Sequence, residues 1–324
     1  SRHEDKALAL VMLRAYNDWH VDEWCGTYPG RFIPLGHVPL WDAELAAEEV
    51  RRLARKGCHA ISLSQNLEEL GFPSWHSPSW DPLWKACSEE GTVVCIHIGS
   101  GAGMHFTSME APVDVMITTA PITIVNCAAD ILWSRTLRAF PDLKVALSEG
   151  GIGWIPYFLE RADYVHANHH QWTHQDFGGK RPSDVWREHM ISCFIDDPIG
   201  LKNRHEVGID TITWECDYPH SDTTWPNSPE VLARQLDGIP DDEINKITHE
   251  NTGRFFQFDP FAHREREAST TAALRAESPD VDTRAKSVRE GTPPSAEADR
   301  PVTSGDVVAQ LSSVYEQQNQ TGGS

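Results

Sequence analysis

Apolar residues along the chain follow two alternating patterns. Short runs rich in β-branched residues recur, and each is followed by a stretch whose apolar residues are three or four positions apart. The first pattern is typical of strands and the second of helices. The run at 92–99 is almost continuously apolar, which is typical of a strand covered on both faces. Six runs predict strands, at 31–38, 59–64, 92–99, 143–149, 190–195 and 211–216.

Helical spacing predicts helices before, between and after these strands. The predicted ranges are 4–23, 43–56, 81–90, 124–140, 154–169, 182–189, 199–207, 229–236, 241–249 and 251–256, with a long irregular loop at 100–120. Regular strand–helix alternation predicts an α/β fold with a parallel sheet, either an open doubly wound sheet or a barrel. No G-x-G-x-x-G motif follows the first strand, which disfavours a dinucleotide-dependent enzyme on an open sheet.

The composition changes near residue 264. Residues 1–263 are predicted to form one α/β domain, whereas 264–324 are rich in Ala, Ser, Thr, Pro and Glu with almost no aromatic residues. Such a segment buries too little apolar surface to fold, so disorder is expected there. Within it, 307–315 has the pattern of a transient helix or a docking segment.

Composition and charge narrow the class of protein. Hydrophobic residues make up 40 % of the chain, with 12 Trp and 11 Phe, which is enough for a sizeable core. The net charge of −20 argues against nucleic acid and anionic membranes as partners. Seven cysteines without a C-x-x-C pair indicate free thiols in a reducing compartment. No Arg-led apolar leader opens the sequence, so no signal peptide is expected, and the most apolar window, 115–129, is too short to span a bilayer. A cytoplasmic location is therefore expected.

Three predicted strands end in polar side chains that suit metal chemistry. His97 lies near the end of one strand, Glu149 ends another before two glycines, and Asp217 follows the last strand with His220 three residues on. Taken singly, each has a structural interpretation: a core histidine, a solvated acid at a turn, and a turn aspartate before Pro219. Together they predict one site, because parallel strands of a barrel end at a common rim. Imidazole and carboxylate groups suit Zn²⁺ or a similar divalent ion.

The segments around these residues resemble the amidohydrolase-related family, which includes aminocarboxymuconate semialdehyde decarboxylase and other metal-dependent hydrolases and carboxy-lyases. The resemblance covers about residues 7–259. It rests on the sequences IHIG at 96–99, LSEGGIGW at 147–154, WECDYPH at 214–220 and ENTGRFF at 250–256. It implies a TIM-barrel-like (β/α)8 fold with one divalent metal, Zn, Mn or Fe, at the rim where the strands end, and His97 and Asp217 among its ligands.

The sequence departs from the family pattern in two ways. The family's decarboxylases usually carry a histidine at the position of Glu149, so the glutamate favours a role in orienting or deprotonating water in a hydrolysis. The family's first strand carries an His-x-His pair, and no predicted strand here contains one. Counted against the family, the six strands match the third to the eighth, so the first two strands are expected to be missing from this chain. His166 and His170 have helical spacing for a metal pair, but capping of a solvated helix end is the alternative.

These observations predict a metal-dependent hydrolase. In the implied mechanism a metal-bound hydroxide attacks an amide, ester or C–C bond of a small acidic or aromatic substrate. Asp217 holds the metal and shares the proton of the water, His97 is a second ligand, and Glu149 and His220 act as catalytic residues. Two alternatives remain open: a decarboxylase of the same family, and an inactive truncated pseudoenzyme without the His-x-His ligands. By resemblance, a homodimer is expected.

Overall fold

The core of the molecule is a five-stranded parallel sheet. The computed structural model describes residues 3–101, 106–220, 222–282, 284 and 300–321. Within them the strands pair in chain order, so each strand lies beside the one that follows it. They are β1 (Ala60–Leu63), β2 (Val93–His97), β3 (Lys144–Ser148), β4 (Met190–Phe194) and β5 (Ile212–Trp214). The sequential parallel order confirms the predicted α/β class, and it is the order of a barrel wall.

The first predicted strand, 31–38, is reduced to a single bridge. Gly36 donates to the carbonyl oxygen of Ala60 at 2.9 Å and accepts from the amide of Ser62 at 3.0 Å, in parallel with β1. The prediction of a full strand is wrong because Pro34 and Pro39 bracket this position and lack the N–H that a sheet ladder needs. The absence of a Cβ at Gly36 leaves room for the buried side chain of Leu53, whose Cδ1 would lie too close to a Cβ there.

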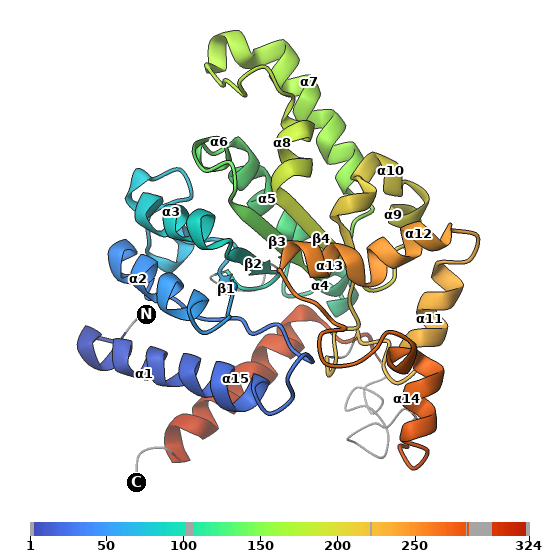
Figure 1. Cartoon of the computed structure of the whole chain (residues 1–324). Coiled ribbons are helices and arrows are strands. Elements are labelled where there is room, and N and C mark those ends of the chain that lie inside the picture. Colours follow the sequence, from blue (N-terminus) through green and yellow to red (C-terminus); the bar gives the residue numbers. More distant parts are fainter. Residues whose placement is uncertain (1–2, 102–105, 221, 283, 285–299, 322–324) are drawn as a thin grey trace.

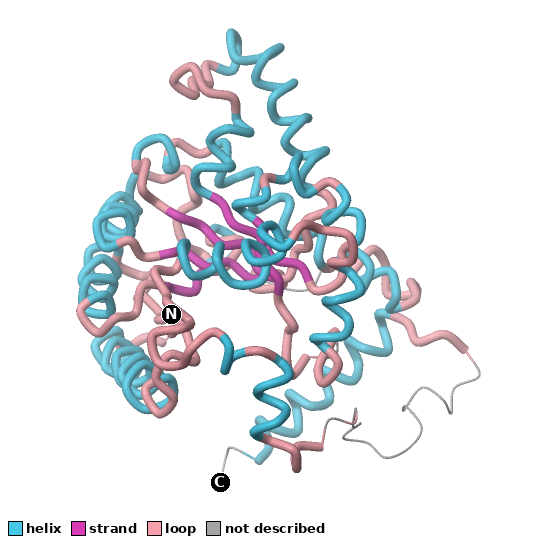
Figure 2. Tube along the Cα trace, turned by 45° about the vertical axis from the view of Figure 1, so that its right-hand side comes forward, coloured by secondary structure: helices cyan, strands magenta, loops and turns pink. Residues whose placement is uncertain are grey.

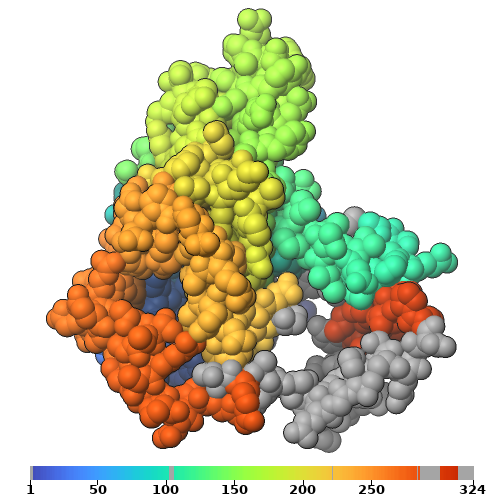
Figure 3. All heavy atoms as spheres, turned by 90° about the vertical axis from the view of Figure 1, so that its right-hand side faces the viewer, coloured from blue at the N-terminus to red at the C-terminus, as the bar shows by residue number. Residues whose placement is uncertain are grey.

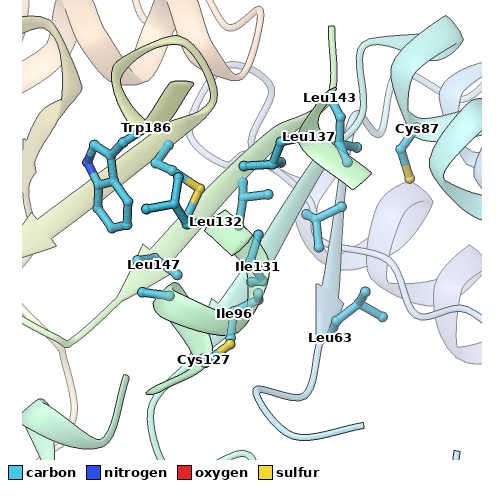
Figure 4. Packing of buried hydrophobic residues seen from close by; sticks show 14 of the residues in the cluster. Leu63, Cys87, Ile96, Cys127, Ile131, Leu132, Leu137, Leu143, Leu147 and Trp186 are labelled. Carbon is cyan, nitrogen blue, oxygen red and sulfur yellow. The ribbon is translucent and has the colours of Figure 1, made fainter. Parts of the chain in front are cut away.

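The two faces of the sheet differ in the size of their side chains. The outer face carries large residues that pack under the helices, including Leu63, Ile96 and Leu147, and Trp186 of the covering helices belongs to the same cluster (Figure 4). The inner face carries a smaller cluster that includes Cys95 and is closed by Phe255. His97 follows Cys95 at the two-residue period of a strand, so it belongs to this inner face, as the sequence predicts.

Most predicted helices are present, with shifted ends. The helices that connect successive strands cover the outer face of the sheet (Figures 1 and 2). Up to residue 173 they are α1 (Lys6–Asp18), the π-helix η1 (Trp19–Cys25), α2 (Ala43–Ala54), α3 (Asp81–Glu90), α4 (Val113–Thr119), α5 (Ile124–Trp133), α6 (Thr136–Ala139) and α7 (Ile155–Thr173). Then come α8 (Pro182–His189), α9 (Pro198–Lys202), α10 (Arg204–Val207), α11 (Ser228–Gln235), α12 (Asp241–Asn245), the π-helix η6 (Lys246–Glu250) and α13 (Asn251–Phe255). Helix α4 lies within the predicted irregular loop 100–120, so that prediction is wrong for 113–119.

Side chains of α13 hold the last strand, β5, through hydrogen bonds to backbone carbonyl groups. Asn251 is 1 % exposed, and its side-chain amide donates to the carbonyl oxygens of Ile209 and Ile212, both at 2.8 Å. Arg254 donates to the carbonyl oxygen of Asp210. These side chains satisfy backbone acceptors around the outermost strand, which would otherwise face solvent or another chain.

Part of the predicted tail has described structure. Helices α14 (Thr271–Glu277) and α15 (Ser304–Thr321) form there, and α15 contains the segment 307–315. The residues before α15 dock on the loop after β2: the amide of Val113 donates to Val302 and that of Ser304 to Ala111, both at 2.9 Å. In Figure 3, α15 lies beside residues of this loop and α4. The residues that dock thus precede 307–315, which lie in a helix. Residues 285–299 lie outside the described residues, and the division at 263 stays a prediction.

The structure also bears on the thiols and on membrane insertion. All seven cysteines are free, as the sequence predicts, and six of them are buried. Among the described residues no single helix is long and apolar enough to cross a membrane; one bent pair, Val113–Thr119 with Pro121–Trp133, reaches the required length and composition.

A buried acid joins the first two helices. The Glu49 side chain on α2 is fully buried and accepts from Arg52 at 2.7 Å, Arg14 at 3.0 Å and Asn17 at 2.8 Å. Asn17 in turn donates to the carbonyl oxygen of His37 at 2.9 Å. Burial alone would raise the pKa of Glu49, but the hydrogen bonds from Arg52 and Asn17 outweigh it and lower the pKa.

Replacing Glu49 by Gln should destabilise the fold by about 3 kcal/mol, because it leaves buried donors and the Arg52 charge uncompensated. Since the folded pKa is lowered, the ionised carboxylate stabilises the native state above the unfolded pKa of about 4.3, and this is lost as pH falls through the folded value. Urea unfolding of Glu49→Gln should therefore lose part of the acid sensitivity of the parent chain. The exposed neighbour offers the control: Glu48→Gln should leave both stability and acid sensitivity unchanged.

Candidate active site

Two neighbouring strands bring the first pair of predicted site residues together. His97 ends β2 and is in register with Ser148, the last residue of β3, so Glu149 follows directly beside it. The Nε2 atom of His97 lies 2.7 Å from Oε1 of Glu149. The expectation that these groups, 52 residues apart, point to a common place is met by the geometry of the parallel register.

The contacts of His97 define where its protons are. Its Nδ1 lies 2.6 Å from the carbonyl oxygen of Ile98, which can only accept, so Nδ1 carries a proton. Its Nε2 lies 2.7 Å from a carboxylate oxygen, so a proton on either of these two atoms can form the hydrogen bond between them. Burial works against the charged ring, but the Ile98 carbonyl and Glu149 outweigh it and raise the pKa of His97. Burial and the neighbouring Asp217 carboxyl raise the pKa of Glu149.

Asp217 and His220 complete a compact group with Glu149. The Nδ1 atom of His220 lies 2.8 Å from Oδ2 of Asp217. Donor atoms of Glu149, Asp217 and His220 all lie within 4.8 Å of one another, which makes these three the candidate metal-holding group within the described part of the chain. Two carboxylates and an imidazole form a donor set that suits Zn²⁺ or Mn²⁺. His97, predicted as a ligand, reaches this group through Glu149.

Both acids sit on unusual backbone. Glu149 has φ 61° and Asp217 has φ 53°, the left-handed region that non-glycine residues seldom occupy. Glu149 directly follows β3, and Asp217 lies three residues after the end of β5, so each left-handed residue belongs to the turn that follows its strand. Local strain of this kind persists only where surrounding contacts hold it, and it concentrates at functional sites.

Sequence reasoning missed Glu215, which lies behind the two acids. Its Oε1 accepts from the backbone amide of Glu149 at 3.1 Å, and burial, with Glu149 and Asp217 nearby, raises the pKa of Glu215 to about 7. The thiol of Cys193 on β4 also contacts the Glu149 amide, at 3.4 Å. The signal was present: Glu215 lies two residues before Asp217 in a strand-like run, where an acid must be satisfied or neutralised.

Asp197, after β4, holds the backbone that follows the two glycines beside Glu149. Its carboxylate accepts from the amides of Ile152 at 2.7 Å, Gly153 at 2.6 Å and Gly200 at 2.8 Å. A Cβ at Gly153 would come within 2.8 Å of this carboxylate. At Gly151, whose φ is 64°, a Cβ would come within 3.2 Å of the same carboxylate, whereas at Gly150 it would meet the side chain of Ile124.

Other candidate residues lie elsewhere. His166 and His170 belong to α7, which projects away from the sheet in Figure 1, and Nδ1 of His170 bonds to the carbonyl oxygen of His166 at 2.9 Å. The ring of His166 packs against Phe177. The helix therefore does not bring this pair to the site at the strand ends.

Comparison with known proteins agrees with the family resemblance of the segments that form the site. A family model described as amidohydrolase matches residues 4–258. The chain belongs to the amidohydrolase family. This confirms the resemblance found in the motifs at 96–99, 147–154 and 214–220.

Individual relatives are distant. The chain is 25 % identical over 157 residues to a 2-amino-3-carboxymuconate-6-semialdehyde decarboxylase of Dictyostelium discoideum, a match that covers 48 % of this chain and 42 % of that protein. The chain thus spans less than half the length of this curated relative.

Solved structures share the fold of this amidohydrolase-family chain at low identity. An amidohydrolase from Mycobacterium avium subsp. paratuberculosis is 22 % identical with a TM-score of 0.65, over 78 % of this chain and 65 % of that one. A 5-carboxyvanillate decarboxylase from Novosphingobium aromaticivorans, solved with bound manganese and a nitrobenzoic acid, is 20 % identical with a TM-score of 0.62, over 79 % and 73 %. These likenesses confirm the TIM-barrel-like fold class.

Replacing Asp197 by Ala should destabilise the protein by about 3 kcal/mol, because three backbone amides lose a charged acceptor. The adjacent Asp196 is exposed and provides a matched control, for which Asp196→Ala should change stability by less than about 0.5 kcal/mol. Urea unfolding of both variants measures this. Equal stability of Asp197→Ala and Asp196→Ala would contradict a supporting role for Asp197 in the turn at Glu149.

Proposed function

We propose that this amidohydrolase-family chain is a metal-dependent hydrolase that cleaves an amide, ester or C–C bond of a small acidic or aromatic substrate. The observation that carries the proposal is the group of Glu149, Asp217 and His220, whose donor atoms lie within 4.8 Å of one another beside the His97–Glu149 pair. The donor set fits a divalent ion, with Zn²⁺ first and Mn²⁺ or Fe²⁺ as alternatives. When bound, such an ion supplies Lewis-acid chemistry and acidifies water.

The protein's own residues supply proton transfer. Oε1 of Glu149 and Nε2 of His97 lie 2.7 Å apart. With the proton of this hydrogen bond on Nε2, Glu149 is ionised and can accept a proton from water, while the ring of His97 keeps its own proton. Asp217 fixes the ring of His220 through Nδ1, which leaves Nε2 of His220 free to hold a ligand or a substrate. Glu215 holds the backbone amide of Glu149 in place from behind. Glu149 thus serves as the base and His97 as its proton partner.

Decarboxylation is the second candidate. It is favoured by the curated relative, which is a decarboxylase, and by the manganese-bound 5-carboxyvanillate decarboxylase of similar fold. In that reaction a carbon atom must receive a proton as carbon dioxide leaves, and the same His97–Glu149 pair can deliver it. The third candidate is a pseudoenzyme that holds no metal.

Metal content separates the enzyme candidates from the pseudoenzyme. Purified chain dialysed against Zn²⁺ or Mn²⁺ should retain close to one ion per chain by elemental analysis, and Asp217→Asn should retain close to none because one of three donors is removed. Asp222→Asn, an exposed acid nearby, is the matched control and should retain the ion. A parent chain that holds no metal under these conditions would contradict the proposal and favour the pseudoenzyme.

The reaction type is tested by two assays on the same metal-loaded protein. One assay follows hydrolysis of aromatic esters and amides, and the other follows carbon dioxide release from hydroxybenzoates and related acids. His97→Gln should lower kcat by about 100-fold or more, since proton transfer is lost. His205 is exposed on α10, so His205→Gln is the matched control and should keep the kcat of the parent chain. Release of carbon dioxide without any hydrolysis would contradict the hydrolase proposal and identify the protein as a decarboxylase.

A further inference from the structure

A hollow lined by aromatic rings lies at the end of the first helix, outside the candidate active site. It measures about 360 Å³ and is lined by residues of one short segment. The lining residues are Trp19, Glu23, Trp24, Thr27, Tyr28 and Phe32. Four large aromatic side chains in one patch remain 42–61 % exposed, which is costly for a soluble surface and marks binding sites more often than scattered apolar residues do.

The rings form two corners around the hollow. The ring centroids of Trp19 and Trp24 are 5.8 Å apart and tilted by 42°, and those of Tyr28 and Phe32 are 6.4 Å apart at 64°. Tilted pairs of this kind present ring faces in several directions, so a guest between the two pairs can meet more than one face.

The π-helix η1 is what places three of these side chains on one face. In an α-helix, residues five apart point in clearly different directions, whereas the wider π turn brings positions i, i+4 and i+5 close together. Trp19, Glu23 and Trp24 have this spacing, and all three lie within η1. Long π-helical stretches are uncommon and are frequent at functional sites.

The charge of the hollow selects the kind of guest. Glu23 is the one lining residue charged at neutral pH, and among the described residues its carboxylate has no cationic partner. The faces of Trp, Tyr and Phe rings are electronegative and attract cations, and Trp does so most strongly. Four aromatic rings with one carboxylate are therefore complementary to a group that is both positively charged and apolar at its surface.

We propose that this hollow, the Trp19–Phe32 cage, binds a small soluble quaternary ammonium compound. A trimethylammonium group combines a full positive charge with a methyl surface that cannot hydrogen-bond to water, so it loses little on leaving solvent. A simple ammonium ion or a lysine side chain is more strongly hydrated and suits the cage less well. None of the residues that line the cage is among the predicted catalytic residues.

Choline and its neutral isostere 3,3-dimethylbutan-1-ol test the proposal, because they have the same shape and differ in charge. Titration calorimetry and saturation-transfer NMR on the full chain should detect choline and show at least about five-fold weaker binding of the isostere. Trp24→Ala should lose about ten-fold or more in choline affinity, Trp24→Phe should be intermediate, and Glu23→Gln should lose about three-fold or more.

Matched controls come from helix α7. Trp172 is 70 % exposed and Glu160 is an exposed acid, so Trp172→Ala and Glu160→Gln remove the same groups at a distance from the cage and should leave choline binding unchanged. Circular dichroism confirms that each variant is folded. Because Trp24 is 54 % exposed, its replacement is not expected to unfold the chain.

Three outcomes would overturn the proposal. Equal binding of choline and its isostere would make the hollow a plain apolar groove. Binding of a trimethyl-lysine peptide without binding of choline would assign it to a protein partner. Concentration-dependent dimerisation that Trp24→Ala abolishes, with no choline binding, would assign the face to a second copy of the chain. None of these results depends on the proposed hydrolase activity, so the two proposals fail or stand separately.

Discussion

The parallel register of β2 and β3 is the constraint on which the candidate site depends. His97 pairs with Ser148, and this places Glu149 within 2.7 Å of the imidazole without any loop having to fold over to bring it there. Parallel strands end at one rim, so the same register that buries Ile96 and Leu147 under the helices sets polar groups side by side. Packing of the outer face and geometry of the site are thus one property of the sheet.

The acids of the site are held by backbone contacts from behind. Glu215 accepts from the Glu149 amide, while Asp197 gathers the amides that follow the glycine pair. Two left-handed residues, Glu149 and Asp217, would relax to ordinary turns without such support. A carboxylate whose approach to another carboxylate is fixed in this way stays ready to share a proton or a cation, because it does not have to reorganise.

The sequence allowed much of this arrangement to be predicted, for definite reasons. The strands at β2 to β5 are short apolar runs between clear helices, so period and composition were sufficient for them. The strand at 31–38 failed because its apolar pattern said nothing about the missing N–H groups of Pro34 and Pro39. Helix α4 was missed because its seven residues lie in a stretch without clear amphipathic spacing.

Side-chain partners were harder to predict than elements. His97, Glu149, Asp217 and His220 could be chosen as residues at strand ends, but the direct His97–Glu149 contact and the grouping of His220 with the two acids depend on left-handed turns that no spacing reveals. Glu215 escaped notice because its role is to accept one backbone amide 66 positions earlier in the chain.

The Trp19–Phe32 cage also depends on side-chain positions that the spacing of the sequence does not reveal. Sequence spacing predicts one continuous helix over 4–23, with Trp19 inside it and Trp24 beyond its end. In the structure the chain widens into a π-helix from Trp19, so Trp24 turns to the face of Trp19 and remains exposed. A regular α-helix would have separated the two rings and left Glu23 beside only one of them. The local widening of one helix therefore converts residues that would cover a core into the walls of a charged hollow.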